Sequence, residues 1–162
     1  MTAPPDTLRK RILEAPRGLY LAGALAWMAG IFVLSGMRIH LPESGYPRLW
    51  SFLVNFFHFP LYAGLGALLL LGLRSGGGEG TPRLGRRAVI SALAVLALYG
   101  AFDEIHQSFT GRTPSVLDFL VDCCGGGAAM AVLRFHLEEG LERRRFLALL
   151  GLLVLAAALF AA

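Results

Sequence analysis

The chain has 162 residues, of which 56% are hydrophobic and only 16% charged, so it is more apolar than a typical soluble domain. The formal charge of +4 does not indicate nucleic-acid binding, because the basic residues form short clusters between long apolar runs. Two adjacent cysteines, Cys123 and Cys124, lie inside an apolar run and predict no disulfide framework. Together these features favour one integral membrane domain.

Residues 1–17 are polar, carry four basic side chains and are expected to form a cytoplasmic tail. The uncharged run 19–37 follows and is long enough to cross about 30 Å of hydrocarbon as a helix. A cleaved signal peptide is disfavoured, because the run is longer than a usual signal core and lacks an A-x-A cleavage site.

The second predicted span covers residues 50–73 and contains Asn55, His58 and Pro60. A loop at 38–48 precedes this span. A Gly-rich basic loop at 74–87 follows it.

The third apolar run, 88–102, is too short to cross a membrane alone. It reaches full length only if the helix continues through residues 103–107. A tight turn then leads to the fourth span, 114–135, for which Thr113 is the expected N-cap and Pro114 the first helical residue.

A charged loop at 134–145 leads to the last apolar segment, 146–162, which has 17 residues. This segment is either a thin span or a helix lying at the membrane interface, and its length slightly favours a span.

The basic residues predict the orientation of this bundle. Twelve of the fifteen Lys and Arg residues fall in the N-terminal tail and in the second and fourth loops, which lie on one side of a five-span layout. The positive-inside rule then places the N-terminus in the bacterial cytoplasm. The predicted fold is an all-α membrane bundle with a tail at 1–17, a four-helix domain at 18–136, and a charged loop with a C-terminal apolar helix at 137–162.

Polar groups interrupt the apolar pattern around the third and fourth spans. Ionisable side chains in membrane helices are costly and most often mark a functional site. Three spans bring His58, Asp103, Asp118 and Asp122 to a similar depth below the outer surface. The predicted ligand-binding residues are His58, Asp103, Glu104, His106, Gln107, Arg112, Asp118 and Asp122.

Helical spacing predicts which of these side chains share a face. Asp118 and Asp122 are four residues apart, and Asp103 shares a face with both His106 and Gln107. Glu104 points elsewhere, towards the turn or Arg112. The short turn makes the third and fourth spans antiparallel neighbours, so the acidic faces can meet.

Two interpretations of this cluster remain open, a structural network satisfied by Arg112 and the histidines, and a functional site. If all four carboxylates are ionised, the cluster carries an excess of about three negative charges and should retain protons or a cation. It would then repel a phosphate unless a metal bridged the two. A divalent cation is one alternative, although no compact metal motif is present. The candidate metal ligands are His58, Asp103, His106, Asp118 and Asp122.

The run Gly125-Gly126-Gly127 directly follows Asp122. Small residues of this kind allow membrane helices to approach closely, so a packing face is predicted next to the acids.

The polar stretch resembles the signature of the VanZ-like family of bacterial membrane proteins. The family pattern is D-E-x-H-Q, then P-G-R, then an Asp and an Asn before glycines. The matching elements span residues 20–135: Leu34-Ser35, Asn55-Phe56-Phe57-His58-Phe59 with Tyr62, Asp103-Glu104-Ile105-His106-Gln107, Gly111-Arg112, Asp118, Asp122 and Gly125-Gly126. Asn55 stands where the family commonly has Lys, Thr110 where it has Pro, and Asp122 where it has Asn, so the site is more negative here.

The resemblance implies an integral membrane protein linked, in the founding member, to low-level teicoplanin resistance. The leading hypothesis is therefore an envelope protein that binds an extracytoplasmic ligand or lipid, such as a lipid-linked or glycopeptide molecule, and affects glycopeptide susceptibility. One alternative is an enzyme acting on a lipid-linked substrate, with Asp103, Glu104 or His106 as general acid or base and Arg112 holding the substrate. Another is a proton- or cation-coupled carrier that uses Asp118 and Asp122. The oligomeric state stays open.

Overall fold

The structure is a computed structural model that describes residues 6–37, 47–75, 84–137 and 142–161. Of these residues 87% are helical, and none of them forms a strand. The helices are α1 (Asp6–Glu14), α2 (Arg17–Ser35), α3 (Pro47–Phe56), α4 (His58–Gly72), α5 (Arg86–Phe109), α6 (Val116–Leu137) and α7 (Arg143–Ala161). Residues 38–46, 76–83 and 138–141, which make up most of the predicted loops, lie outside the described residues.

Five helical stretches are long and apolar enough to cross a membrane, as the sequence predicted. They are Arg17–Ser35, Phe52–Gly72, Arg86–Phe109, Val116–Leu137 and Arg143–Ala161. The third helix does continue through the polar residues 103–107. The fifth begins at Arg143 and so is longer than the predicted apolar segment.

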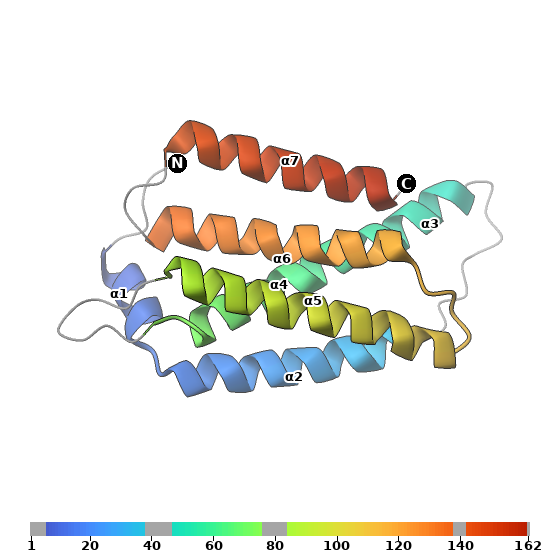
Figure 1. Cartoon of the computed structure of the whole chain (residues 1–162), viewed down its shortest axis with the longest axis horizontal. Helices are drawn as coiled ribbons and strands as arrows, with labels where there is room; N and C mark the ends of the chain where they lie inside the picture. The colour runs from blue at the N-terminus through green and yellow to red at the C-terminus, as the bar shows by residue number, and fades with distance from the viewer. Residues whose placement is uncertain (1–5, 38–46, 76–83, 138–141, 162) are drawn as a thin grey trace.

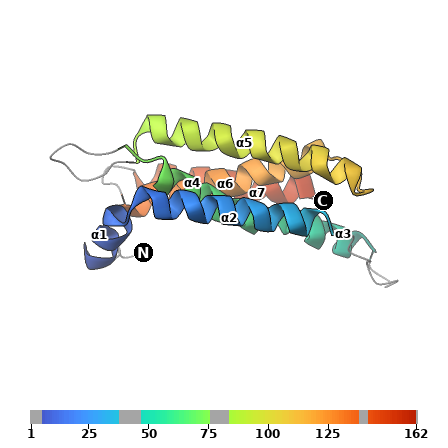
Figure 2. The same ribbon diagram turned by 90° about the horizontal axis from the view of Figure 1, so that it is seen from below.

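The five stretches run antiparallel to their neighbours in sequence (Figure 1). α6 lies between α7 and the pair α4 and α5, and α2 covers the opposite side of that pair (Figures 1 and 2). Many large apolar side chains point outward, including Leu98, which is 73% exposed, and Leu152, which is 64% exposed. Exposed apolar surface on this scale indicates a lipid bilayer environment and a multi-pass membrane protein.

The second span is interrupted at Phe57, which separates α3 from α4. Pro60 has no N–H with which to bond the carbonyl of Phe56, and its ring crowds that carbonyl, so the helix breaks there. The last turn of α3 is closed by the Phe57 N–H, which bonds both Leu53 O and Val54 O. This break places His58 in the first turn of α4.

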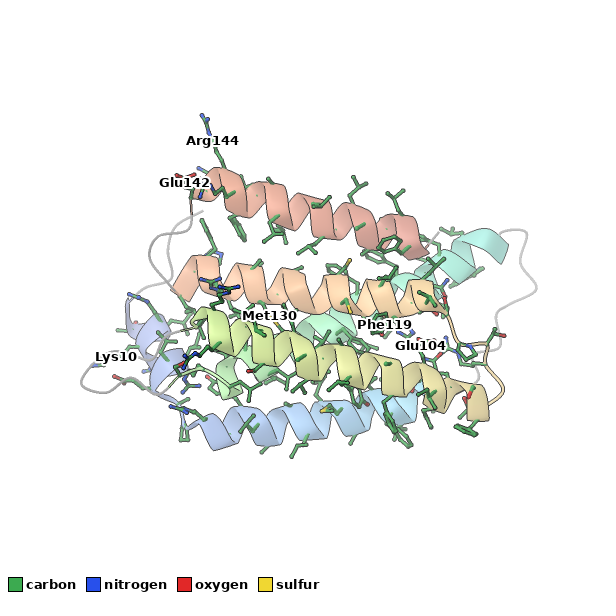
Figure 3. All side chains as sticks on the ribbon, in the orientation of Figure 1. Lys10, Glu104, Phe119, Met130, Glu142 and Arg144 are labelled. Carbon is green, nitrogen blue, oxygen red and sulfur yellow. The ribbon has the colours of Figure 1, made fainter. Side chains whose placement is uncertain are left out.

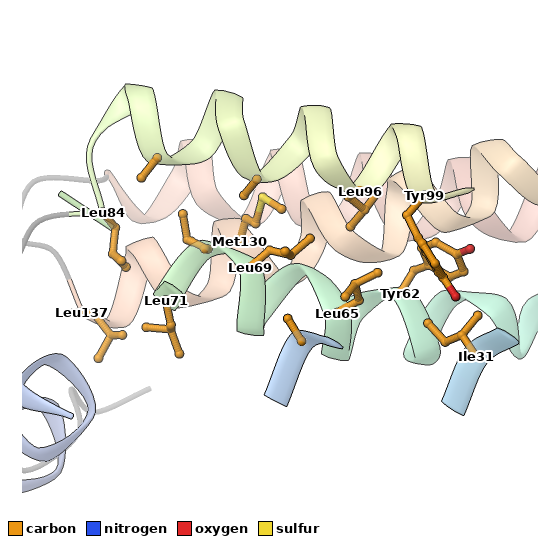
Figure 4. Packing of buried hydrophobic residues seen from close by; sticks show 14 of the residues in the cluster. Ile31, Tyr62, Leu65, Leu69, Leu71, Leu84, Leu96, Tyr99, Met130 and Leu137 are labelled. Atoms are coloured by element: carbon orange, nitrogen blue, oxygen red, sulfur yellow. The ribbon is translucent and has the colours of Figure 1, made fainter. Parts of the chain in front are cut away.

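Glycines bring α4 and α6 into very close contact. A Cβ added at Gly66 would lie 2.7 Å from Gly126 Cα, and one added at Gly125 would lie 2.2 Å from the carbonyl oxygen of Phe59. The prediction that the glycine run of α6 is a packing face is therefore confirmed. Leu65, Leu69, Leu96, Met130 and other buried side chains fill the core around this contact (Figure 4).

The predicted tail is partly helical and is docked on the bundle. The buried Arg74 side chain donates hydrogen bonds to the carbonyls of Leu71, Leu13 and Ala15, and its guanidinium lies over the Tyr20 ring. Tyr20 in turn donates its hydroxyl to Ile12 O at 2.9 Å. These contacts fix α1 against the ends of α2 and α4.

Candidate functional site

The predicted polar residues gather at one end of the bundle, where α2 ends, α3 meets α4, and α5 turns into α6. Glu104 lies at this end, whereas Lys10, Glu142 and Arg144 lie at the other (Figure 3). Seven polar side chains here are buried: Ser35, His58, Asp103, Glu104, Gln107, Asp118 and Asp122. The two other predicted residues, His106 and Arg112, are half-buried.

Asp103 is fully buried, and both of its oxygens are bonded. Ser35 donates its hydroxyl to Oδ1 at 2.6 Å, and Gln107 donates its amide to Oδ2 at 3.0 Å. The predicted shared face of Asp103 and Gln107 is thus observed as a hydrogen bond. Asp103 connects α5 to the end of α2.

His106 also faces α2 rather than the other acids. Its ring stacks on Phe32, with 3.8 Å between the centroids, and Nδ1 lies 3.4 Å from Ser35 Oγ. Ser35 is thus the common neighbour of Asp103 and His106, but its hydroxyl proton is donated to the carboxylate.

Glu104 caps the following helix. Its Oε2 accepts the backbone N–H of Ser115 at 2.6 Å, and Ser115 Oγ accepts the N–H of Asp118 at 3.3 Å. A capping box normally uses a carboxylate three residues after the cap, but here the carboxylate comes from the preceding helix. The predicted cap at Thr113 is therefore wrong: the helix begins at Val116, and the two bonds favour Ser115 as its cap.

His58 and Asp122 form a buried pair between α4 and α6. His58 Nδ1 lies 3.0 Å from Asp122 Oδ1, and the side-chain exposures are 9% and 0%. An imidazole that donates through Nδ1 carries its free lone pair on Nε2. Tyr62 packs beside it, with its ring 6.4 Å from the His58 ring.

Arg112 follows Gly111, whose φ of 79° lets the chain reverse between α5 and α6. The turn is closed by the N–H of Arg112 bonding Gln107 O at 3.1 Å. The guanidinium reaches the carbonyl of Ser35 at 3.5 Å and makes no ion pair with any residue that the structure describes. Arg112 therefore does not neutralise the carboxylates through direct contact, as a purely structural network would require.

A cavity of about 110 Å³ opens between α2, α4 and the α5–α6 turn. Its polar side chains are Ser35, His58, Asp103 and Arg112, and its walls are Ile31, Leu34, Met37, Val54, Phe57 and Leu61. Glu104, Asp118 and Asp122 do not line it. The cavity is therefore polar at one end and apolar elsewhere, a lining suited to a molecule of the same mixed character.

Four buried carboxylate and amide oxygens have no hydrogen-bond partner among the described residues: Glu104 Oε1, Gln107 Oε1, Asp118 Oδ1 and Asp122 Oδ2. Acceptors at such depth are normally satisfied, so this cluster has capacity for protons or for added hydrogen-bond donors. Within the same part of the chain, no three His, Cys, Asp or Glu side chains are arranged to hold a metal ion. The five candidate metal ligands do not form one site.

Sequence reasoning did not predict Ser35 and Ser115 as site residues, although Leu34-Ser35 matches the family pattern, and it counted Asn55 with the site. Ser35 and Ser115 have no recognisable catalytic context in the sequence, and their roles depend on partners in other helices. Asn55 points away from the cluster, and its amide lies 3.5 Å from the carbonyl of Ala161 on α7.

No curated protein and no solved structure matches this chain. A family model does match: the model described as VanZ/LLP1 covers residues 16–137, which include α2 to α6 and every residue of the polar cluster. This match extends over most of the chain and ends before α7. The chain thus belongs to the VanZ/LLP1 family of proteins.

Proposed function

We propose that this VanZ-like protein resides in the bacterial cytoplasmic membrane and binds an amphiphilic envelope ligand at its outer face. The binding site is the cavity formed by Ser35, His58, Asp103 and Arg112. Binding there alters the susceptibility of the cell to glycopeptides of the teicoplanin type. The observation that carries the proposal is the combination of a polar end and apolar walls in one cavity at membrane depth.

The orientation in this proposal follows from the basic residues. α1 and the basic first turn of α7 lie at the end of the bundle opposite the α5–α6 turn (Figure 1), and Arg74 is at the same end, because it bonds the carbonyls of Leu13 and Ala15. Basic clusters are retained in the cytoplasm, so the cavity faces outward. An extracytoplasmic ligand can then reach it from the outer leaflet.

Arg112 is the group expected to hold the polar part of the ligand. Its guanidinium has five N–H donors, of which the structure shows one in use, in a long bond to Ser35 O. An arginine beside an apolar cavity favours an anion that offers two oxygens to the guanidinium, such as a carboxylate or phosphate. His58 Nε2 offers a second polar contact.

Native mass spectrometry of the purified protein, mixed with a total envelope-lipid extract, tests binding. The wild-type protein should retain a bound lipid that Arg112→Gln loses, and Arg144→Gln, an exposed residue at the other end, should behave like wild type. Equal retention by all three proteins would refute the site. Cells expressing wild type or Arg112→Gln are then compared for their teicoplanin minimum inhibitory concentration, which should differ.

A second candidate function, acid–base catalysis on a lipid-linked substrate, is favoured by the His58–Asp122 pair. A carboxylate that fixes the imidazole through Nδ1 leaves Nε2 to take a proton from a group in the cavity. His58 fits this role better than Asp103, Glu104 or His106, because Glu104 and His106 do not line the cavity and both oxygens of Asp103 accept hydrogen bonds. Incubation with radiolabelled envelope lipids should yield a modified lipid that His58→Gln does not produce. Binding without any modified product would exclude catalysis and leave the binding function.

A further inference from the structure

A second cavity, of about 250 Å³, lies between α2 and α4. Its lining is apolar and comprises Gly23, Ala26, Trp27, Gly30, Ile31, Leu34 and Leu61. Ile31, Leu34 and Leu61 also line the polar cavity, so the two cavities lie next to each other along α2. We call the second cavity the α2–α4 groove.

The polar cavity and the α2–α4 groove together have a length that suits one membrane leaflet. Twelve residues separate Ser35, at the polar end, from Gly23, at the far end, and helical rise makes this about 18 Å. The hydrocarbon of one leaflet is about 15 Å thick, half of the bilayer core. A lipid anchored by its head at the polar cavity would therefore have its chain alongside the groove.

The surface of the groove is built from an aromatic ring and from small residues. Trp27 donates its indole N–H to Leu61 O at 2.8 Å, so its polar atom is satisfied and the ring presents apolar surface. Gly64 permits this position, since a Cβ there would lie 2.8 Å from the ring. A Cβ added at Gly30 would meet no atom within 4 Å, so the groove is open at that residue.

The polar cavity favours a lipid with an anionic head group. The sequence-based expectation that a phosphate would be repelled counted all four carboxylates as facing the ligand. Only Asp103 lines the cavity, and its oxygens are bonded by Ser35 and Gln107. Asp122 is paired with His58. The cationic group that lines the cavity without an ion pair among the described residues is Arg112.

We infer that the ligand is a lipid phosphate with a single apolar chain. Its phosphate bonds Arg112, and its chain lies in the α2–α4 groove past Gly30 to Trp27. The groove, at about 250 Å³, is too small for the two chains of a phospholipid, which favours a single-chain ligand. This inference rests on the proposed function and specifies its ligand class.

Trp27 provides a direct test, because the chain has only two tryptophans and Trp50→Phe leaves Trp27 as the sole reporter. The Trp50→Phe protein, in nanodiscs of phosphatidylcholine, is titrated with an alkyl monophosphate brominated in mid-chain, which quenches tryptophan on contact. Saturable quenching is expected, with competition by the unbrominated phosphate and not by the alcohol of the same chain. Arg112→Gln should weaken the affinity about ten- to a hundredfold.

Gly30→Leu fills the groove at its open point and should abolish the quenching. Gly151→Leu is the matched control, because a Cβ at Gly151 on α7 also meets no atom within 4 Å and lies outside the groove. It should quench like the parent protein. Butyl monophosphate, which carries the same head on a chain too short for the groove, should bind both variants with equal affinity in isothermal titration calorimetry.

Each contrary result has a defined meaning. If Gly30→Leu leaves quenching unchanged while Arg112→Gln still lowers affinity, the groove assignment is wrong and the proposed function stands. If Arg112→Gln changes no affinity, both fail. If brominated phosphatidylglycerol saturates at lower concentration than the monophosphate, the two-chain lipid replaces the single-chain ligand. A dimer, measured by light scattering and lost in Gly30→Leu, would assign the groove to a second copy instead.

Discussion

The contact between α4 and α6 predicts a large effect from one methyl group at Gly66. A Cβ there would lie 2.7 Å from Gly126 Cα and 2.8 Å from Gly126 O, both of them backbone atoms that no rotamer change can move. The helices would have to separate by about 0.7 Å to restore ordinary van der Waals contact. Overpacking of this kind costs about 1–3 kcal/mol. For a chain of this length that corresponds to a fall in Tm of roughly 2–12 °C.

The same separation should disturb the polar cluster. The His58–Asp122 bond, at 3.0 Å, joins the same two helices, and a comparable displacement would lengthen it beyond the roughly 3.5 Å limit of a hydrogen bond. Gly66→Ala should therefore melt earlier than wild type and also change the ¹⁵N shifts of the His58 ring.

Gly30→Ala is the matched control for Gly66→Ala. It makes the same change in a membrane helix where a Cβ meets no atom within 4 Å, and it shares the gain of about 1 kcal/mol in helix propensity. Thermal unfolding in nanodiscs, followed by circular dichroism, compares the two variants. If Gly66→Ala melts at or above the temperature of Gly30→Ala, the reasoning from backbone contact is refuted.

Three further predictions concern the polar contacts. His58→Phe should destabilise the fold by about 3–5 kcal/mol, because it leaves Asp122 buried without its partner, and adding Asp122→Leu should restore much of this stability. A double variant as unstable as the single variant would contradict the pairing. Ser115→Ala should cost about 0.5–2 kcal/mol and speed deuterium exchange at the Asp118 amide, whereas unchanged exchange would argue against the cap. Arg74→Gln should release α1, so that trypsin cuts at Arg9 faster than in wild type or in the control variant Arg144→Gln. Equal cleavage rates would show that α1 is held by other contacts.

The sequence by itself determined the number and approximate limits of the membrane helices. Apolar length and the placement of charges are local properties, and they predicted five spans and the continuation of α5 through the polar residues 103–107. Helical spacing also predicted that Asp103 and Gln107 share a face, because side chains four residues apart lie above one another. The glycine run of α6 indicated close packing for the same local reason.

Only the tertiary structure decided which polar groups bond to one another. Ser35 reaches Asp103, Glu104 reaches the N–H of Ser115, and His58 reaches Asp122, and each bond depends on how two helices are rotated and how far apart they lie. Sequence spacing gives a face within a helix but not its rotation against a neighbour, and hydrogen bonds tolerate only a few tenths of an ångström. For the same reason the sequence could not show that Arg112 stays without an ion pair among the described residues and lines a cavity. That arrangement is set by the close contact of α4 with α6 and by the turn at Gly111, which together keep Glu104, Asp118 and Asp122 out of the cavity lining and leave the guanidinium in it.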